Sequence, residues 1–120
     1  MPLGADELAN TYAAAWREKD ATRRRDLLNT CCEEDVRFVQ EGIDLTGVHA
    51  LCDLIGEFWA GTPEGDAVTV EITSEIQEHH GFGRASFVWK NPDGDSPGTD
   101  FVERGPNGKM KTIVVFMDPR

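Results

Sequence analysis

The spacing of apolar residues changes about halfway along the chain, and this change limits the possible folds more than any other feature. In the first half, apolar residues recur every three or four positions, which predicts helices over residues 6–19, 22–32 and 48–59. Alternating apolar residues predict short strands before the last helix, at 35–39 and 43–45, and longer ones in the second half, at 68–80, 83–90, 99–104 and 109–117. Helices followed by an antiparallel meander predict one α+β domain over residues 1–120.

The charge balance of the chain argues against nucleic acid as a partner. Asp and Glu number 22 against 12 Lys and Arg, which gives a formal net charge of −10. Binding to phosphates requires Lys and Arg gathered in a patch. The one basic run, Arg23-Arg24-Arg25, is flanked by Asp20 and Asp26, and we interpret it as a solvated helix face.

Apolar segments and cysteines indicate a cytoplasmic protein that does not enter a membrane. No apolar stretch is long enough to span a bilayer, and residues 1–7 lack the apolar segment of a signal peptide. We therefore expect neither a transmembrane helix nor a signal peptide. The cysteines, Cys31, Cys32 and Cys52, are odd in number and lie in predicted helices, so we expect free thiols in a reducing compartment. Their spacing from the histidines fits no zinc site, so no metal is expected.

Two predicted turns decide which strand side chains share a face of the sheet, because side chains along a strand alternate. A two-residue turn at Gly81-Phe82 predicts the pairs His80–Gly83, Ile76–Phe87 and Ser74–Trp89. Asn-Gly is a strong hairpin signal, so a turn at Asn107-Gly108 predicts the pairs Asp100–Val115 and Val102–Ile113. One face then holds a single acid, Asp100, among the apolar residues Val70, Ile72, Ile76, Ala85, Phe87, Trp89, Val102, Ile113, Val115 and Met117.

Asp100 is the polar exception on this apolar face. Ionising a carboxyl group there costs several kcal/mol unless a partner compensates the lost hydration. Either the carboxyl group is partnered, or its pKa is raised and it becomes a proton donor near neutral pH.

The opposite face of the sheet is also partly apolar. It carries Val88, Phe101, Val114 and Phe116 beside charged residues such as Arg84. The helices can cover only one face, and an apolar second face needs another cover. We therefore expect a homodimer that forms through this outer face.

Several short motifs follow one another in a recognisable order: Tyr12-Ala13-Ala14-Ala15-Trp16 with Asp20, Thr46-Gly47 with Ala50-Leu51, His79-His80, Arg84 and Trp89, Gly98-Thr99-Asp100, and Gly108-Lys109-Met110 with Phe116. Their order from Tyr12 to Asp118 resembles the nuclear transport factor 2-like superfamily, and most of all its branch of SnoaL-like polyketide cyclases and ketosteroid isomerases. The resemblance implies a cone-shaped fold, in which a curved, mostly antiparallel sheet wraps around three N-terminal helices and leaves a cavity open at one end.

The resemblance also implies roles for particular residues. Ketosteroid isomerases stabilise a dienolate oxygen with a tyrosine on the first helix and a protonated aspartic acid on a late strand, and Tyr12 and Asp100 match these positions. A second aspartate shuttles the proton in those enzymes. Its position falls on Gln40, or on Glu41 or Asp44, and a glutamine cannot act as a base. In SnoaL-like cyclases a late-strand aspartate is the general acid/base, a role that Asp100 could fill with a histidine beside it.

The predicted register turns His80 inward, although a one-residue bulge would turn His79 inward instead. The catalytic candidates are therefore Asp100, Tyr12 and His80. The expected ligand-binding residues are the aromatic and aliphatic side chains Trp16, Phe38, Trp59, Phe87, Trp89, Val102 and Val115.

These predictions leave three functions open. The first is a SnoaL-like protein that binds a hydrophobic small molecule and could be a cofactor-independent isomerase or cyclase acting on a ketone or polyketide-like substrate. The second is a carrier or sensor that uses the same cavity without catalysis. The third is an interaction module whose interior is filled by its own side chains.

Overall fold

Three helices form one layer of the molecule. The computed structural model describes residues 3–65 and 67–119. Its helices lie where the apolar spacing predicts them: α1 (Ala5–Arg17), α2 (Ala21–Cys31) and α3 (Val48–Ala60). On α1, the buried residues include Leu8, Tyr12 and Ala15, which lie on one face of an amphipathic helix. α2 begins after Asp20, whose carboxylate accepts a hydrogen bond of 2.9 Å from the backbone N–H of Arg23.

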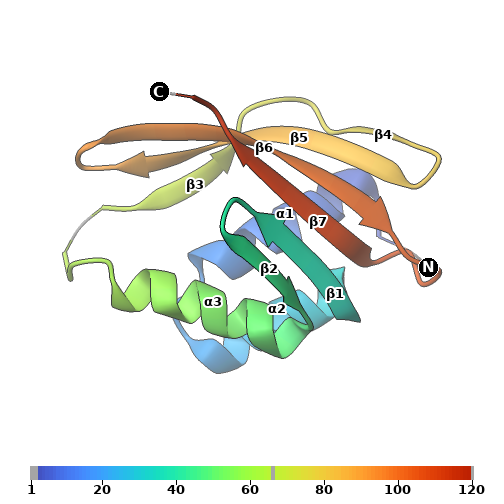
Figure 1. The fold of residues 1–120 in the computed structure, drawn as a ribbon, viewed down its shortest axis with the longest axis horizontal. Helices are drawn as coiled ribbons and strands as arrows, with labels where there is room; N and C mark the ends of the chain where they lie inside the picture. Colours follow the sequence, from blue (N-terminus) through green and yellow to red (C-terminus); the bar gives the residue numbers. More distant parts are fainter. Residues whose placement is uncertain (1–2, 66, 120) are drawn as a thin grey trace.

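The second layer is a seven-stranded sheet that curves over the helices (Figure 1). Its strands are β1 (Cys32–Gln40), β2 (Ile43–Thr46), β3 (Thr69–Ile72), β4 (Gln77–His79), β5 (Phe82–Asn91), β6 (Gly94–Arg104) and β7 (Met110–Met117). The strand order is β2-β1-β7-β6-β5-β3, with β4 also paired to β5, and β1 runs parallel to β7 while the other pairs are antiparallel. The predicted α+β class is confirmed.

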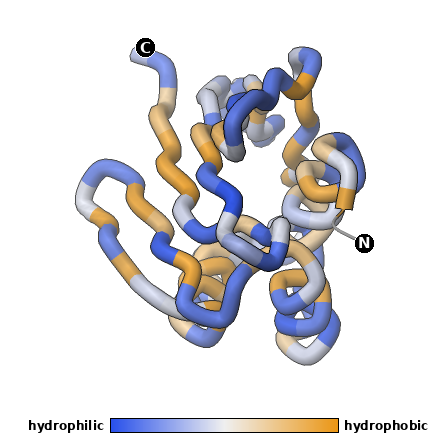
Figure 2. The backbone as a smooth tube through the Cα atoms, turned by 90° about the vertical axis from the view of Figure 1, so that its right-hand side faces the viewer, coloured by the Kyte–Doolittle hydropathy of each residue, from blue (hydrophilic) through white to orange (hydrophobic). Residues whose placement is uncertain are grey.

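The core lies between the helices and the strands β1 and β7. Its fully buried side chains include Leu28, Phe38, Leu51, Ile55 and Ile113. Viewed along the long axis of the molecule, the strands curl around the helical layer instead of lying flat on it (Figure 2). No helix within the described ranges is long and apolar enough to cross a membrane.

The register of the last hairpin agrees with the prediction around Asp100, although it shifts by one residue between Glu103 and Arg104, closer to the turn. Asp100 lies opposite Val115, and Val102 lies opposite Ile113. On its other side Asp100 lies opposite Ala85 of β5. Residues opposite one another in antiparallel strands point to the same face. Asp100 therefore points toward the helices, as the sequence predicts.

The register of the preceding hairpin differs by one residue from the prediction. The turn residues are His80 and Gly81, with φ of 53° and 80°, and Phe82 belongs to β5, opposite His79. Two successive positive φ values match the turn geometry that fits the twist of a hairpin. Since His80 itself occupies the turn, its predicted inward orientation is wrong.

The predicted long strand over 68–80 is interrupted. Between β3 and β4 the backbone leaves the regular ladder, and the Ser74 hydroxyl accepts a hydrogen bond of 2.8 Å from the backbone N–H of Ser86. Because of this interruption, Phe87 lies opposite Ile72 instead of Ile76. Similarly, residues 91–98, which lie between the predicted strands 83–90 and 99–104, are not a loop, because β5 and β6 continue to a tight turn between Asn91 and Gly94.

The basic run on α2 is only partly solvated. Arg23 and Arg25 are exposed, but Arg24 is 4% exposed. Its guanidinium donates hydrogen bonds to the backbone carbonyls of Glu18 (3.0 Å) and Lys19 (3.3 Å), just after the end of α1, and to Cys52 Sγ at 3.4 Å. The interpretation of the whole run as a solvated face is therefore wrong for its central residue.

Candidate functional site

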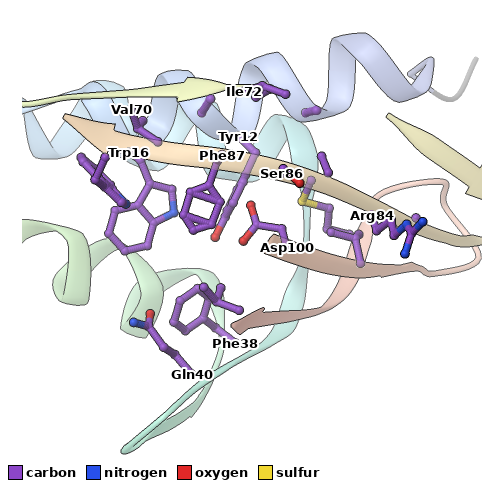
Figure 3. A pocket seen from close by; sticks show the side chains of 18 of the residues that line it. Tyr12, Trp16, Phe38, Gln40, Val70, Ile72, Arg84, Ser86, Phe87 and Asp100 are labelled. Carbon is purple, nitrogen blue, oxygen red and sulfur yellow. The ribbon is translucent and has the colours of Figure 1, made fainter. Parts of the chain in front are cut away.

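A cavity of about 540 Å³ lies between the concave face of the sheet and the helices α1 and α3 (Figure 3). Cavities of this size hold small organic molecules. The sheet residues that line it include all those predicted for the inner face except Ile113, which is fully buried in the core. Six aromatic residues also contribute to its lining: Tyr12, Trp16, Phe38, Phe58, Phe87 and Trp89.

Asp100 lies on the wall of this cavity and points toward Tyr12 in Figure 3. Its side chain is partly accessible because it borders the void, yet protein surrounds it on nearly all other sides. Burial raises the pKa of Asp100 from its ordinary value near 3.8 to about 7. Across the described residues, no hydrogen bond or ion pair to its carboxyl group is found. The carboxyl group is thus a single acid in an apolar cavity, titrating near neutral pH.

Tyr12 projects from the buried face of α1 into the same region. Its hydroxyl oxygen is buried and makes no hydrogen bond within the part of the chain that the structure describes. Burial raises the pKa of Tyr12 well above 10, the charge of Asp100 raises it further, and the nearby Trp16 side chain has a smaller opposing effect. Tyr12 therefore keeps its proton and presents an unused hydrogen-bond donor.

An aromatic wall closes the cavity near the C-terminal end of α1. The ring centroid of Trp16 lies 6.0 Å from that of Phe38, 6.3 Å from that of Phe58 and 5.8 Å from that of Trp89. The ring centroids of Phe58 and Trp89 are 4.8 Å apart. Such edge-to-face and tilted contacts are favourable for aromatic rings. They hold the rings in fixed positions around the void.

Trp59 does not line the cavity, contrary to the prediction. Its indole N–H donates a hydrogen bond of 2.9 Å to the backbone carbonyl of Trp16, and its ring packs against Phe58 at 5.1 Å. Trp59 supports the aromatic wall from behind. Phe58, one residue earlier on α3, lines the cavity instead. Helical spacing alone does not decide which of these two adjacent aromatic residues faces the cavity.

The structure separates the histidines from Asp100. His79 and His80 are both exposed in the β4–β5 hairpin, and their Nδ1 atoms are 3.1 Å apart. Neither lines the cavity. The predicted catalytic residues Asp100 and Tyr12 are brought together, whereas His80 is not.

The resemblance places the second catalytic carboxylate of ketosteroid isomerases at Gln40, Glu41 or Asp44, and neither of the two acids among them lines the cavity. Gln40 lines the cavity. Glu41 is exposed, and Asp44 is ion-paired with Arg37 at 2.9 Å on the surface. That ion pair lowers the pKa of Asp44. Of these three candidates only Gln40 lines the cavity, so a neutral amide stands where the resemblance implies a base.

The rim of the cavity is more polar than its interior, and sequence reasoning missed this. Its polar lining residues include Glu57, Glu78, Asn91 and Ser96, which come from four separate elements. Most of these residues are far apart in the sequence, and they come together only through the curvature of the sheet. No local sequence pattern could therefore have predicted that they share a site. In the residues described, no group of three or more His, Cys, Asp or Glu side chains could hold a metal ion.

The comparisons with known proteins agree with this architecture. The sequence matches no protein-family model and no curated protein. Among solved structures, it is similar to a SnoaL-like family protein from Agrobacterium tumefaciens str. C58, proposed to be an isomerase, with 29% identity over 96% of this chain and 97% of that chain, at a TM-score of 0.84.

Two further structures share the fold at lower identity. One is a protein with a ketosteroid isomerase-like fold from Catenulispora acidiphila DSM 44928 in complex with trimethylamine, with 16% identity over 94% of this chain and 86% of that chain, and a TM-score of 0.74. The other is an NTF2-like protein of unknown function from Exiguobacterium sp. 255-15, with 16% identity over 94% of this chain and 99% of that chain, and a TM-score of 0.70. The helices-first order, the curved sheet and these similarities together show that the chain has the fold of nuclear transport factor 2-like proteins.

Proposed function

We propose that this protein binds an apolar small molecule in its cavity and transfers a proton to or from that molecule through Asp100. The observation that carries the proposal is the Asp100 carboxyl group, which lies on the wall of an apolar cavity of about 540 Å³ without a protein partner among the described residues. Glu57 and Glu78, which also line the cavity, are exposed. Natural cores rarely keep an unpartnered carboxyl group unless it has a task, because it destabilises the folded state when it ionises.

The pKa of Asp100 suits this role. An acid with a pKa of about 7 is present in both forms at neutral pH, so it can donate a proton to one ligand atom and accept one from another. Tyr12 remains protonated, and its hydroxyl group can donate a hydrogen bond to an oxygen atom of the ligand on which negative charge develops.

The reactions that fit this pair need only proton transfer. Isomerisation of a ketone, aldol-type cyclisation and dehydration belong to this class, and none of them requires a cofactor. Gln40 cannot replace a second carboxylate, so a mechanism with two cavity acids is not supported. The similarity to a SnoaL-like protein proposed to be an isomerase agrees with a proton-transfer reaction, and the trimethylamine complex of the Catenulispora protein agrees with a ligand site in this fold.

A non-catalytic carrier is the second candidate, and Gln40 is the observation that favours it. If no second group can move a proton across the ligand, the cavity could hold an apolar molecule without changing it. The two functions differ in what Asp100→Asn does. It abolishes turnover in an enzyme but leaves the binding of neutral ligands almost unchanged in a carrier.

The decisive experiment has two steps. Native mass spectrometry of the purified protein first identifies a co-purifying ligand, whose chemistry then defines the substrate assay. Asp100→Asn and the matched control Asp95→Asn, an exposed carboxylate on the same strand, are compared for turnover. We expect loss of at least about 100-fold for Asp100→Asn only. Equal turnover in both variants contradicts the catalytic role, and failure of any apolar ligand to bind contradicts the proposal as a whole.

We also propose that two copies associate through the outer face of the sheet. Phe101 and Phe116 are 39% and 60% exposed there, and their ring centroids are 5.8 Å apart. Exposed neighbouring aromatic rings are typical of protein contact surfaces. Sedimentation should show a dimer for the natural sequence and a monomer for Phe116→Ser, while a monomeric natural protein contradicts this proposal.

A further inference from the structure

Asp100 and the aromatic residues around it form a site with negative but no positive character. The charged or titratable side chains that line the cavity besides Asp100 are Tyr12, Glu57, Glu78 and Arg84. Arg84 is exposed and bonded to the side chain of Gln77, and Glu78 is ion-paired with Arg104 at 2.6 Å. Gln77 is neutral, so Arg84 keeps its charge at an exposed position of the lining. No basic side chain of the described residues forms an ion pair with Asp100, however, so a positive charge beside this carboxylate has to come from the ligand.

The aromatic wall is also suited to a positive charge. The face of an aromatic ring carries partial negative charge and attracts organic cations, most strongly when water is excluded. Trp16, Phe38, Phe58 and Trp89 line one end of the cavity and are held by their mutual contacts. Phe87 and Tyr12 continue this aromatic surface toward Asp100 (Figure 3). A ligand in the cavity would thus touch ring faces and one carboxylate.

The charge of the whole protein acts in the same direction. A formal net charge of −10 attracts cations to the surface and repels anions, which affects how often each meets the cavity mouth. Glu57, exposed on α3 at the rim, adds a negative charge along that path. An anionic ligand would meet repulsion from Glu57, and beside Asp100 it would find no basic partner among the described residues, because Arg84 lies at an exposed position of the lining.

We infer that the natural ligand is a hydrophobic organic cation, an alkyl- or arylamine whose ammonium group lies beside the Asp100 carboxylate and whose apolar part contacts the aromatic wall. This inference rests on the proposed function, because it names the ligand class of the same cavity. It differs from a neutral ketone in one respect that can be measured. An amine requires ionised Asp100, whereas a ketone oxygen requires the protonated acid.

A matched pair of probes tests the inference. Benzyltrimethylammonium and neopentylbenzene have the same shape and differ in one atom, nitrogen against carbon, and therefore in charge. Their binding is followed by the fluorescence of the tryptophans, two of which line the cavity. We expect the affinity of the cation to rise about 10-fold from pH 5.5 to pH 8.5, since Asp100 ionises in this interval, while that of the neutral isostere stays level or falls.

Two variants complete the experiment. Asp100→Asn should weaken binding of the cation at pH 8.5 by about 10-fold and leave that of neopentylbenzene unchanged or tighter. Asp95→Asn, which removes an exposed carboxylate of the same strand outside the cavity lining, should change both affinities by less than about 2-fold. The inference is overturned if neopentylbenzene binds but the cation does not. It is also overturned if the affinity of the cation changes neither with pH nor in Asp100→Asn, and in both cases the proposed apolar ligand site stands. A loss of cation binding in Asp95→Asn but not in Asp100→Asn also overturns it. If neither probe binds, the inference is overturned, and the proposed function is then decided by whether an apolar ligand co-purifies with the protein.

Discussion

Arg24 and Asp100 are both ionisable groups surrounded by protein, but their surroundings differ. Arg24 packs between α2 and α3, and hydrogen bonds to two backbone carbonyls and a cysteine sulfur occupy its guanidinium. Asp100 borders a cavity and has no such bonds within the described residues. A buried charged group whose hydrogen bonds are satisfied stabilises the fold. A group that lacks such bonds and borders a cavity is available to bind a ligand. Substitutions at the two sites should therefore have opposite effects on stability.

The largest effect is expected for Arg24→Ala. The substitution leaves the carbonyls of Glu18 and Lys19 without their donor and opens a gap beside Cys52. We expect a loss of about 3 kcal/mol in the free energy of unfolding, measured by urea denaturation. Arg23→Ala and Arg25→Ala, its exposed neighbours, are matched controls that should change the free energy by less than about 0.5 kcal/mol. A similar small effect at Arg24 would remove the contrast with Asp100.

Asp100→Asn should stabilise the protein, and the gain should depend on pH. In the unfolded chain the pKa of Asp100 is near 4, and in the folded protein it is about 7. The folded state therefore binds the proton more tightly, so the natural protein loses stability as the pH rises from about 4 to about 7. Three pKa units correspond to about 4 kcal/mol at pH 8. Because the carboxyl group is partly accessible from the cavity, we expect the variant to be more stable by about 2–3 kcal/mol at pH 8, and by less than about 0.5 kcal/mol at pH 4.

Urea denaturation of both proteins at these two pH values measures the difference. A variant that is less stable than the natural protein at pH 8 would show that Asp100 is a structural hydrogen-bonding residue like Arg24. The site would then lose its functional interpretation.

Gly56→Ala should have a smaller, destabilising effect. An added Cβ atom at this position of α3 would lie 2.8 Å from Nη2 of Arg24. Since Arg24 is held by several hydrogen bonds, we expect a net loss of about 1 kcal/mol despite the better helix propensity of alanine. The double variant with Arg24→Ala should show no additional loss, because the clash is then absent. Additive losses in that double-mutant cycle would mean that Gly56 serves another purpose.

The sequence was sufficient to place Asp100 but not to place the histidines. The Asn107-Gly108 turn predicts the pair Asp100–Val115, and this pair is found, although the ladder shifts by one residue between Glu103 and Arg104. At the other hairpin, the positive φ of His80 and the interruption after Ile72 shift the pairing. Both depend on contacts with β5 that alternation of apolar residues does not reveal.

Burial of single polar residues was also beyond the sequence. Arg24 lies between two exposed arginines in the sequence, so residue type alone does not single it out. Its burial depends on the backbone carbonyls just after the end of α1 and on the small residue Gly56 of α3. Trp59 and Phe58 are adjacent and aromatic, and only the packing of α3 decides which of them faces the cavity. Periodicity assigns a face to a helix, but the exact edge of that face is set by its neighbours.

The protonation of Asp100 is the most direct measure of whether it is held alone in an apolar cavity. Selective labelling of aspartate with ¹³C lets NMR follow its carboxyl signal through a pH titration, with Asp100→Asn identifying the signal. The account predicts a midpoint of about 7. A midpoint near 4, the ordinary range of a solvated aspartate, would contradict it.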